Sequence, residues 1–167
     1  MKKTITLLCL LILVSGCSPI FNRLDEHISR TENVLDEEIP LDLWEKIEDN
    51  SKSKSDLDYI KYSYYEIGNK YTSEPRYYLR ESYSKFWETN VTEIWEGTAD
   101  RPSSVQNYML KLVLIKSGRF SEEDIISVNT YCGITPHQYL KVRVDNEWID
   151  VDVWDKEQPH KFGELTC

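Results

Sequence analysis

The stretch TPHQYLKVRVDNEWIDVDVWD, which runs from Thr135 to Asp155, carries the strongest structural signal in the chain. Aliphatic residues alternate with polar or aromatic ones on both sides of Asp145-Asn146, which is the period of strands with one buried face. Asp and Asn suit a two-residue hairpin turn. The stretch therefore predicts two antiparallel strands joined at Asp145-Asn146.

A turn at these two residues sets the pairs across the hairpin. Val142 lies opposite Ile149, and such pairs form an aliphatic core face. His137 and Asp152 become diagonal neighbours on the other face, with Cα atoms roughly 7–8 Å apart, so their side chains can form a hydrogen bond. The remaining expected pairs are Leu140–Val151, Lys141–Asp150, Tyr139–Asp152 and His137–Trp154.

The spacing alone leaves two interpretations of His137 and Asp152. A hairpin that is purely structural needs neither residue, which favours a catalytic pair. A lone histidine on a strand is nevertheless usually a satisfied polar residue, and alternating aspartates usually face solvent.

The rest of the chain is helical first and extended later. Apolar spacing predicts helices over 41–48 and 57–71, another after Pro75, and one over 104–116 that is apolar almost all round and therefore buried. Gly118 is expected to end the last of these, and 125–131 predicts a strand. Tyrosines crowd the predicted helices from 59 to 83, either as a glycan- or partner-binding face or at the rim of a helical core. The order predicts an α+β fold with a helical N-terminal half and a buried central helix packed on an antiparallel sheet.

The first residues have the layout of an export signal. Two lysines precede an apolar segment from Ile5 to Val14, which is short for a membrane span. The tetrapeptide VSGC at 14–17 then resembles a bacterial lipobox, whose cysteine is acylated, with palmitate for example, and becomes the first mature residue. The resemblance implies a signal peptide over 1–16 and a lipid anchor at Cys17. Because Ser18 follows the cysteine, it also implies an outer-membrane lipoprotein that faces the periplasm.

Composition limits the domain count and the partners. An apolar stripe at 21, 24, 28 and 35 and a polar break at 50–55 predict that 17–55 form the anchor, a juxtamembrane helix and a linker, and that 56–167 form one domain. The chain has 20 basic and 29 acidic residues, for a net charge of −9, and no basic stripe, which argues against a nucleic-acid partner. Its three histidines lack metal-ligand spacing, and neither metal nor cofactor is expected.

The chain has four cysteines. Cys9 lies in the signal and Cys17 in the lipobox, which leaves Cys132 and Cys167 in a compartment where disulfides persist. Their spacing leaves open whether they pair or stay free.

The hairpin is similar to a known catalytic hairpin. The pattern HxYxxVxVDNxWIxVD, from His137 to Asp152, resembles the histidine–aspartate hairpin of the transglutaminase-like cysteine peptidase superfamily, although Tyr139 stands where tryptophan is common. The resemblance covers roughly 96–155. It implies a papain-like core in which a nucleophilic cysteine begins the buried helix while the histidine and aspartate lie on adjacent strands. A helix N-terminus favours a thiolate and supplies amide donors for an oxyanion.

The chain departs from this family at the nucleophile. In the family, the cysteine stands about fifteen residues before the glycine that closes the helix. Counting back from Gly118 in this chain gives Ser103 as the equivalent position. A register shifted by one residue gives Ser104. An alignment anchored on the run QNY at 106–108 gives Val105 instead. The predicted helix contains no cysteine.

Three interpretations of the site follow. Ser103 is a helix cap, because Ser103 and Gln106 fit a capping box, and the site is dead. Alternatively, Ser103, His137 and Asp152 form a serine triad, in which the hydroxyl depends on its general base. Finally, Cys132 is a displaced nucleophile, which a disulfide at this cysteine would exclude.

Each interpretation implies a function. A dead site implies a pseudoenzyme, a membrane-anchored envelope lipoprotein whose groove binds a peptide, a peptidoglycan fragment or an envelope protein. A working nucleophile implies an amide-bond hydrolase, with peptidoglycan as one candidate substrate. A structural or interaction lipoprotein that makes no use of the groove is the remaining class.

Overall fold

The structure is a computed structural model that describes residues 38–71, 90–97, 102–132, 135–154 and 162–165. Within these ranges the elements are the α-helices α2 (Leu41–Ser51), α3 (Asp56–Lys70), α5 (Val91–Glu96) and α6 (Ser103–Lys116), the 3-10 helix η2 (Glu122–Asp124), and the strands β1 (Ile125–Cys132), β2 (Thr135–Val144) and β3 (Glu147–Val151). The export signal with Cys17, the apolar stripe at 21–35, the helix expected after Pro75, and Cys167 lie outside the described residues.

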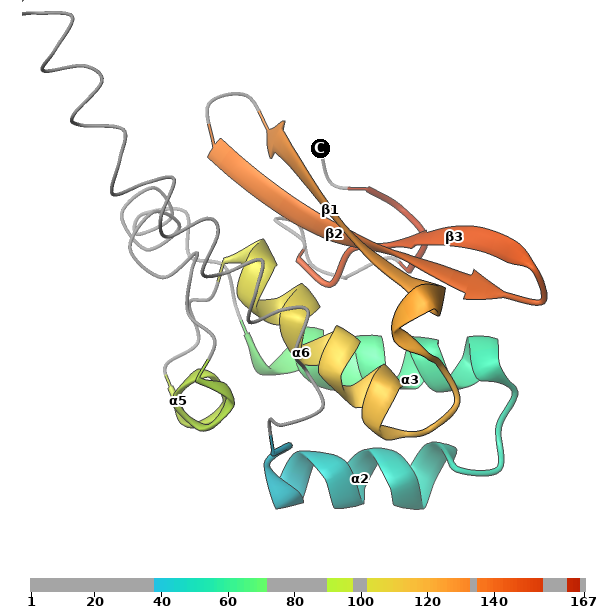
Figure 1. Ribbon diagram of the computed structural model, residues 1–167. Helices are drawn as coiled ribbons and strands as arrows, with labels where there is room; N and C mark the ends of the chain where they lie inside the picture. Colours follow the sequence, from blue (N-terminus) through green and yellow to red (C-terminus); the bar gives the residue numbers. More distant parts are fainter. Residues whose placement is uncertain (1–37, 72–89, 98–101, 133–134, 155–161, 166–167) are drawn as a thin grey trace, which may run out of the picture.

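The helix α6 lies between the sheet and the other helices, with β2 on one side and α3 on the other (Figure 1). All residues from Ser103 to Ile115 are buried, so the predicted buried central helix is confirmed. Gly118, at a φ of 71°, follows the C-cap residue Ser117 and ends the helix as expected. The helices precede an antiparallel sheet in the chain, and the fold is α+β.

The sheet has the order β1-β2-β3, and both pairs of strands are antiparallel. Asp145 and Asn146 have φ angles of 51° and 67°, and positive φ at both central residues is the signature of a type I′ hairpin turn. The predicted turn and register are therefore confirmed, with the pairs Leu140–Val151, Lys141–Asp150 and Val142–Ile149.

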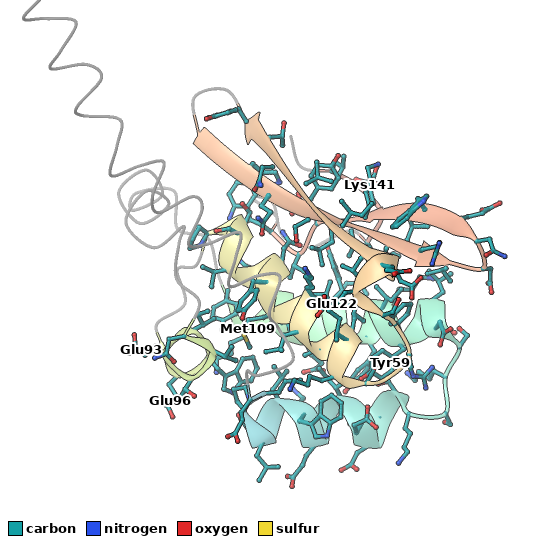
Figure 2. The ribbon with its side chains drawn as sticks, viewed as in Figure 1. Tyr59, Glu93, Glu96, Met109, Glu122 and Lys141 are labelled. Carbon is teal, nitrogen blue, oxygen red and sulfur yellow. The ribbon has the colours of Figure 1, made fainter. Side chains whose placement is uncertain are left out.

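One hydrophobic core joins the helices to the inner face of the sheet. Figure 2 shows Met109 on the side of α6 toward the helices, and Lys141 on the face of the sheet turned away from α6. Leu43 and Ile47 of α2 have no exposed surface and belong to the same core. The expected boundary at 55–56 therefore falls in the turn between α2 and α3, and the helix before it shares the domain core.

Local hydrogen bonds hold the polar break at 50–55 as a turn between α2 and α3. Ser55 caps α3 by accepting a hydrogen bond from the Asp58 amide at 3.2 Å. Arg119, just beyond α6, donates to the Lys54 carbonyl at 3.1 Å and to Asp56 Oδ1 at 2.8 Å. These contacts fasten the turn to the end of the central helix.

Three of the described tyrosines lie deeper than the rim of the core. Tyr59, Tyr64 and Tyr71 are buried in the core, and Tyr71 donates its hydroxyl proton to the Ile94 carbonyl at 2.8 Å. Tyr65 is 40% exposed. The three buried side chains are therefore part of the core itself, and the expected position at its rim is wrong for them.

Candidate functional site

His137 and Asp152 form a hydrogen-bonded pair, with 2.7 Å between His137 Nε2 and Asp152 Oδ2. His137 lies on β2, and Asp152 directly follows Val151, the last residue of β3. The ladder between β2 and β3 ends at Leu140–Val151, so the expected pairs Tyr139–Asp152 and His137–Trp154 are not ladder pairs. The Trp154 ring nevertheless lies 5.3 Å from the His137 ring. Both members of the pair are 1% exposed, so they are not the polar residues of a solvated strand. The carboxylate fixes the orientation of the imidazole.

The second nitrogen of the imidazole has a different environment. His137 Nδ1 is buried and has no hydrogen-bond partner in the part of the chain that the structure describes. The two nitrogens of a neutral imidazole have opposite roles, one donating and one accepting. When Nε2 donates to Asp152, Nδ1 presents a lone pair, which is the form that a general base or a ligand acceptor requires.

Ser103 begins α6 but does not cap it. Pro102 is the N-cap residue, and no side chain caps this helix end. Ser103 Oγ instead accepts a hydrogen bond from the Gln138 amide at 3.1 Å. The expected capping box with Gln106 is therefore wrong, because the helix starts one residue earlier than a serine cap requires and the hydroxyl is directed across to β2.

Asn107 fills the gap where β3 separates from β2. Continued past Val151, the register would pair Gln138 with Val153 in a hydrogen-bonded pair. The Asn107 side-chain amide takes the place of this pair: Nδ2 donates to the Gln138 carbonyl at 2.7 Å, and Oδ1 accepts from the Val153 amide at 3.1 Å. A helix side chain thus replaces the missing ladder bonds.

The same amide connects the helix to the carboxylate of the pair. Asn107 Nδ2 lies 2.9 Å from the Ser103 carbonyl and 3.3 Å from Asp152 Oδ1. Asp152 Oδ1 also accepts from the Trp154 amide at 3.2 Å. No sequence pattern predicted a role for Asn107 at the site. The available signal was a polar residue one helical turn after Ser103, on the same face of an otherwise apolar helix.

The helix geometry separates the candidate nucleophile positions. Ser103 and Asn107, four residues apart, both bond to Gln138 and so share the face of α6 toward β2. Val105 is about 200° around the helix from Ser103 and is fully buried in the hydrophobic core. Ser103 is therefore the candidate that faces the strand carrying His137. Ser104 is also fully buried.

The remaining predicted site residues lie at or beyond the limits of the described chain. Cys132 is the last residue of β1, and its backbone pairs with Thr135. The position of its side chain and its relation to Cys167 are outside the described residues. Among the residues that are described, no group of three or more His, Cys, Asp or Glu side chains is placed to hold a metal ion. No helix in this part of the chain has the length and apolar character of a membrane span.

No protein-family model matches the chain, and neither a curated protein nor a solved structure matches it significantly.

Proposed function

We propose that the chain is a lipid-anchored bacterial envelope protein whose domain is a non-catalytic relative of the transglutaminase-like peptidases. In this proposal Cys17 holds it in the outer membrane facing the periplasm, and the domain binds a peptide, a peptidoglycan fragment or an envelope protein. One observation carries the proposal: Ser103 Oγ accepts a hydrogen bond from the Gln138 amide, while His137 Nδ1 has no hydrogen-bond partner among the described residues. The candidate nucleophile and the candidate base are not joined.

The contacts of Ser103 also favour a structural role. A serine hydroxyl needs a general base to attack, since its own pKa is far above neutrality. If Ser103 turned toward His137, it would leave the buried Gln138 amide without an acceptor, at a cost of roughly 1–3 kcal/mol.

One substitution separates the non-catalytic from the catalytic function. Ser103→Ala should lower the free energy of unfolding by roughly 1–3 kcal/mol, because Gln138 N–H loses its acceptor, and should leave ligand capture unchanged. If Ser103 is a nucleophile, the same variant loses all turnover of a fluorogenic peptide library or of peptidoglycan fragments. Urea denaturation measures the first effect and fluorescence release the second.

A thiol placed at the same position tests whether the site still activates a nucleophile. Ser103→Cys is made with all four native cysteines replaced by alanine, so that iodoacetamide reports one thiol. If the site is non-catalytic, the new thiol should not react with iodoacetamide at a pH well below 8.5, which is about the pKa of a free cysteine. The denatured chain serves as the positive control. Rapid labelling near pH 6 that disappears on adding His137→Ala would contradict the proposal.

A second candidate is an amide-bond hydrolase that uses Ser103 or Cys132 with His137 and Asp152. The observation in its favour is the buried Nδ1 without a described partner, on an imidazole already oriented by a carboxylate. This candidate predicts that wild-type chain cleaves the peptide library and that His137→Ala does not. Comparing Ser103→Ala with Cys132→Ala then identifies the nucleophile.

A further inference from the structure

The backbone of β2 shows which groups of β1 face away from the sheet. The two-residue turn makes Val144 and Glu147 a hydrogen-bonded pair. Hydrogen-bonded pairs alternate along an antiparallel ladder, so every second residue of β2, from Val144 back to Gln138, directs its N–H and C=O toward the β3 side and away from β1. Two hydrogen bonds agree with this assignment: the Gln138 amide donates to Ser103 Oγ, and the Gln138 carbonyl accepts from Asn107 Nδ2. The β1 residues opposite this set therefore direct their own backbone groups outward.

These outward groups form an open edge. Ser127 and Asn129 lie opposite Leu140 and Gln138, and Tyr131 continues the alternation. In the described chain no backbone hydrogen bond beyond the sheet ladder involves any of the three. Since β1 is the first strand in the order β1-β2-β3, nothing described pairs with this side of it.

The two edges of the sheet differ in how they are protected. Natural edge strands avoid unwanted pairing by being short or by carrying charge or proline. The β3 edge has five residues, with Glu147 and Asp150 among them. The strand β1 has eight residues without a charge or a proline, and the side chains of Ile126 and Tyr131 are 46% and 72% exposed. Of these two edges, β1 is the one open to pairing.

The pattern and charge of this edge define what fits it. Outward groups on every second residue, about 6.8 Å apart, match another extended backbone. The chain has a net charge of −9, and the exposed Glu122 and Glu123 lie just before β1. A second copy of the chain would bring the same negative charge, and an acidic peptide would meet the same repulsion.

We infer that the free edge of β1 docks an extended polypeptide segment without acidic residues, which adds a fourth strand to the sheet. Ile126 and Tyr131 contribute apolar contacts on its two faces. The inference goes beyond the function proposed above, because this edge requires neither Ser103 nor the His137–Asp152 pair.

The experiment uses the full chain in detergent and a phage-displayed library of random decapeptides. The best enriched peptide is synthesised with a single N-methyl group at each position in turn, and its affinity is measured by fluorescence anisotropy. Strand addition predicts at least tenfold weaker binding for methylation at every second residue and less than a twofold change at the residues between. A pattern without this period of two, or no enriched peptide, would overturn the inference.

Two matched proline substitutions assign the binding to one edge. Ser127→Pro removes an outward N–H but no bond to β2, and proline is tolerated at such edge positions. It should weaken peptide binding at least tenfold, whereas Asp150→Pro, at an outward position of β3, should change it less than twofold. Circular dichroism checks that both variants fold.

Other outcomes locate the binding elsewhere. Equal binding by wild type and Ser127→Pro would overturn the inference. Loss of binding in a folded Asp152→Ala variant, with binding kept in Ser127→Pro, would assign the peptide to the His137 site and leave the function proposed above intact. If the wild-type chain binds no peptide but forms a dimer, and Ser127→Pro makes that dimer dissociate, the occupant of the edge is a second copy of the chain.

Discussion

His137 Nε2 and Asp152 Oδ2 lie 2.7 Å apart, and neither residue is more than 1% exposed. A buried carboxylate is costly unless hydrogen bonds compensate for its lost water. Asp152 receives that compensation from the imidazole, from Asn107 Nδ2 and from the Trp154 amide. The pair is therefore part of the domain's stability, whatever ligand or chemistry it serves.

Two aspartates two residues apart should respond very differently to replacement by alanine. Asp152→Ala should lower the free energy of unfolding by about 3–5 kcal/mol, because the buried imidazole and the Trp154 amide lose the carboxylate to which they donate. Asp150→Ala breaks only the half-exposed ion pair with Lys141 and should cost less than about 1 kcal/mol. Urea denaturation followed by tryptophan fluorescence measures both. Similar losses for the two variants would show that the buried pair contributes little.

Removing the side-chain amide of Asn107 should open the end of the hairpin. Asn107→Ala leaves the Gln138 carbonyl and the Val153 amide without partners, and we expect a loss of about 2–5 kcal/mol. Asn107→Asp should not restore stability at pH 7, since a carboxylate cannot donate to Gln138 and would face Asp152. Chemical denaturation gives the energies, and faster hydrogen exchange at Gln138 and Val153 locates the effect. Wild-type stability of Asn107→Asp would contradict the assigned hydrogen bonds.

The carboxyl of Asp124 should contribute a pH-dependent term to stability. Hydrogen bonds from the Ser121 hydroxyl and backbone amide, together with Arg143, lower the pKa of Asp124 to about 2. Its unfolded pKa is about 3.9, so the stabilisation is complete above about pH 4 and is lost as the pH falls toward 2. Because this surface carboxyl is screened by solvent, Asp124→Asn should cost no more than about 1 kcal/mol at pH 7.

The difference between wild type and Asp124→Asn should therefore shrink between pH 4 and pH 2. Thermal unfolding at a series of pH values measures it, and Glu123→Gln, at an exposed neighbouring carboxyl, is the control. A difference that stays constant down to pH 2 would refute the role of the Asp124 charge.

The lipid anchor has a test of its own, based on the VSGC tetrapeptide at 14–17. Cys17→Ala should abolish incorporation of radiolabelled palmitate and release the chain from the membrane fraction or block its processing. Cys9→Ala, within the predicted signal, should leave labelling intact. Failure of the wild-type chain to take up label would refute the lipoprotein assignment.

The hairpin shows how far local sequence determines this structure. Alternation on both sides of Asp145-Asn146 sets the period, and the turn residues set the register, because a one-residue slip would move every side chain to the opposite face. The pairing of β2 with β3 and the proximity of His137 to Asp152 follow from these local rules. The burial of α6 was equally visible, since a helix that is apolar on all sides needs neighbours on all sides.

The hydrogen bonds at the start of α6 could not be predicted from local sequence patterns. Ser103 and Gln106 satisfy a capping pattern, yet Ser103 Oγ bonds to Gln138, thirty-five residues along the chain. The reason is that β3 leaves the ladder at Val151, and the unpaired groups of β2 need partners that only a neighbouring element supplies. Asn107 and Ser103 supply them, and no pattern within the helix encodes that need.

Periodicity and turn chemistry therefore determined the α+β order, the hairpin register and the two residues of the buried pair, because each depends on neighbours within a few positions along the chain. Tertiary structure alone decided that α2 shares the core, that Ser103 bonds to a strand and not to its own helix, and that Asn107 replaces the end of a β-ladder. Those features depend on which distant backbone groups would otherwise be buried without a hydrogen bond, and that becomes defined only when the helix and the sheet pack together.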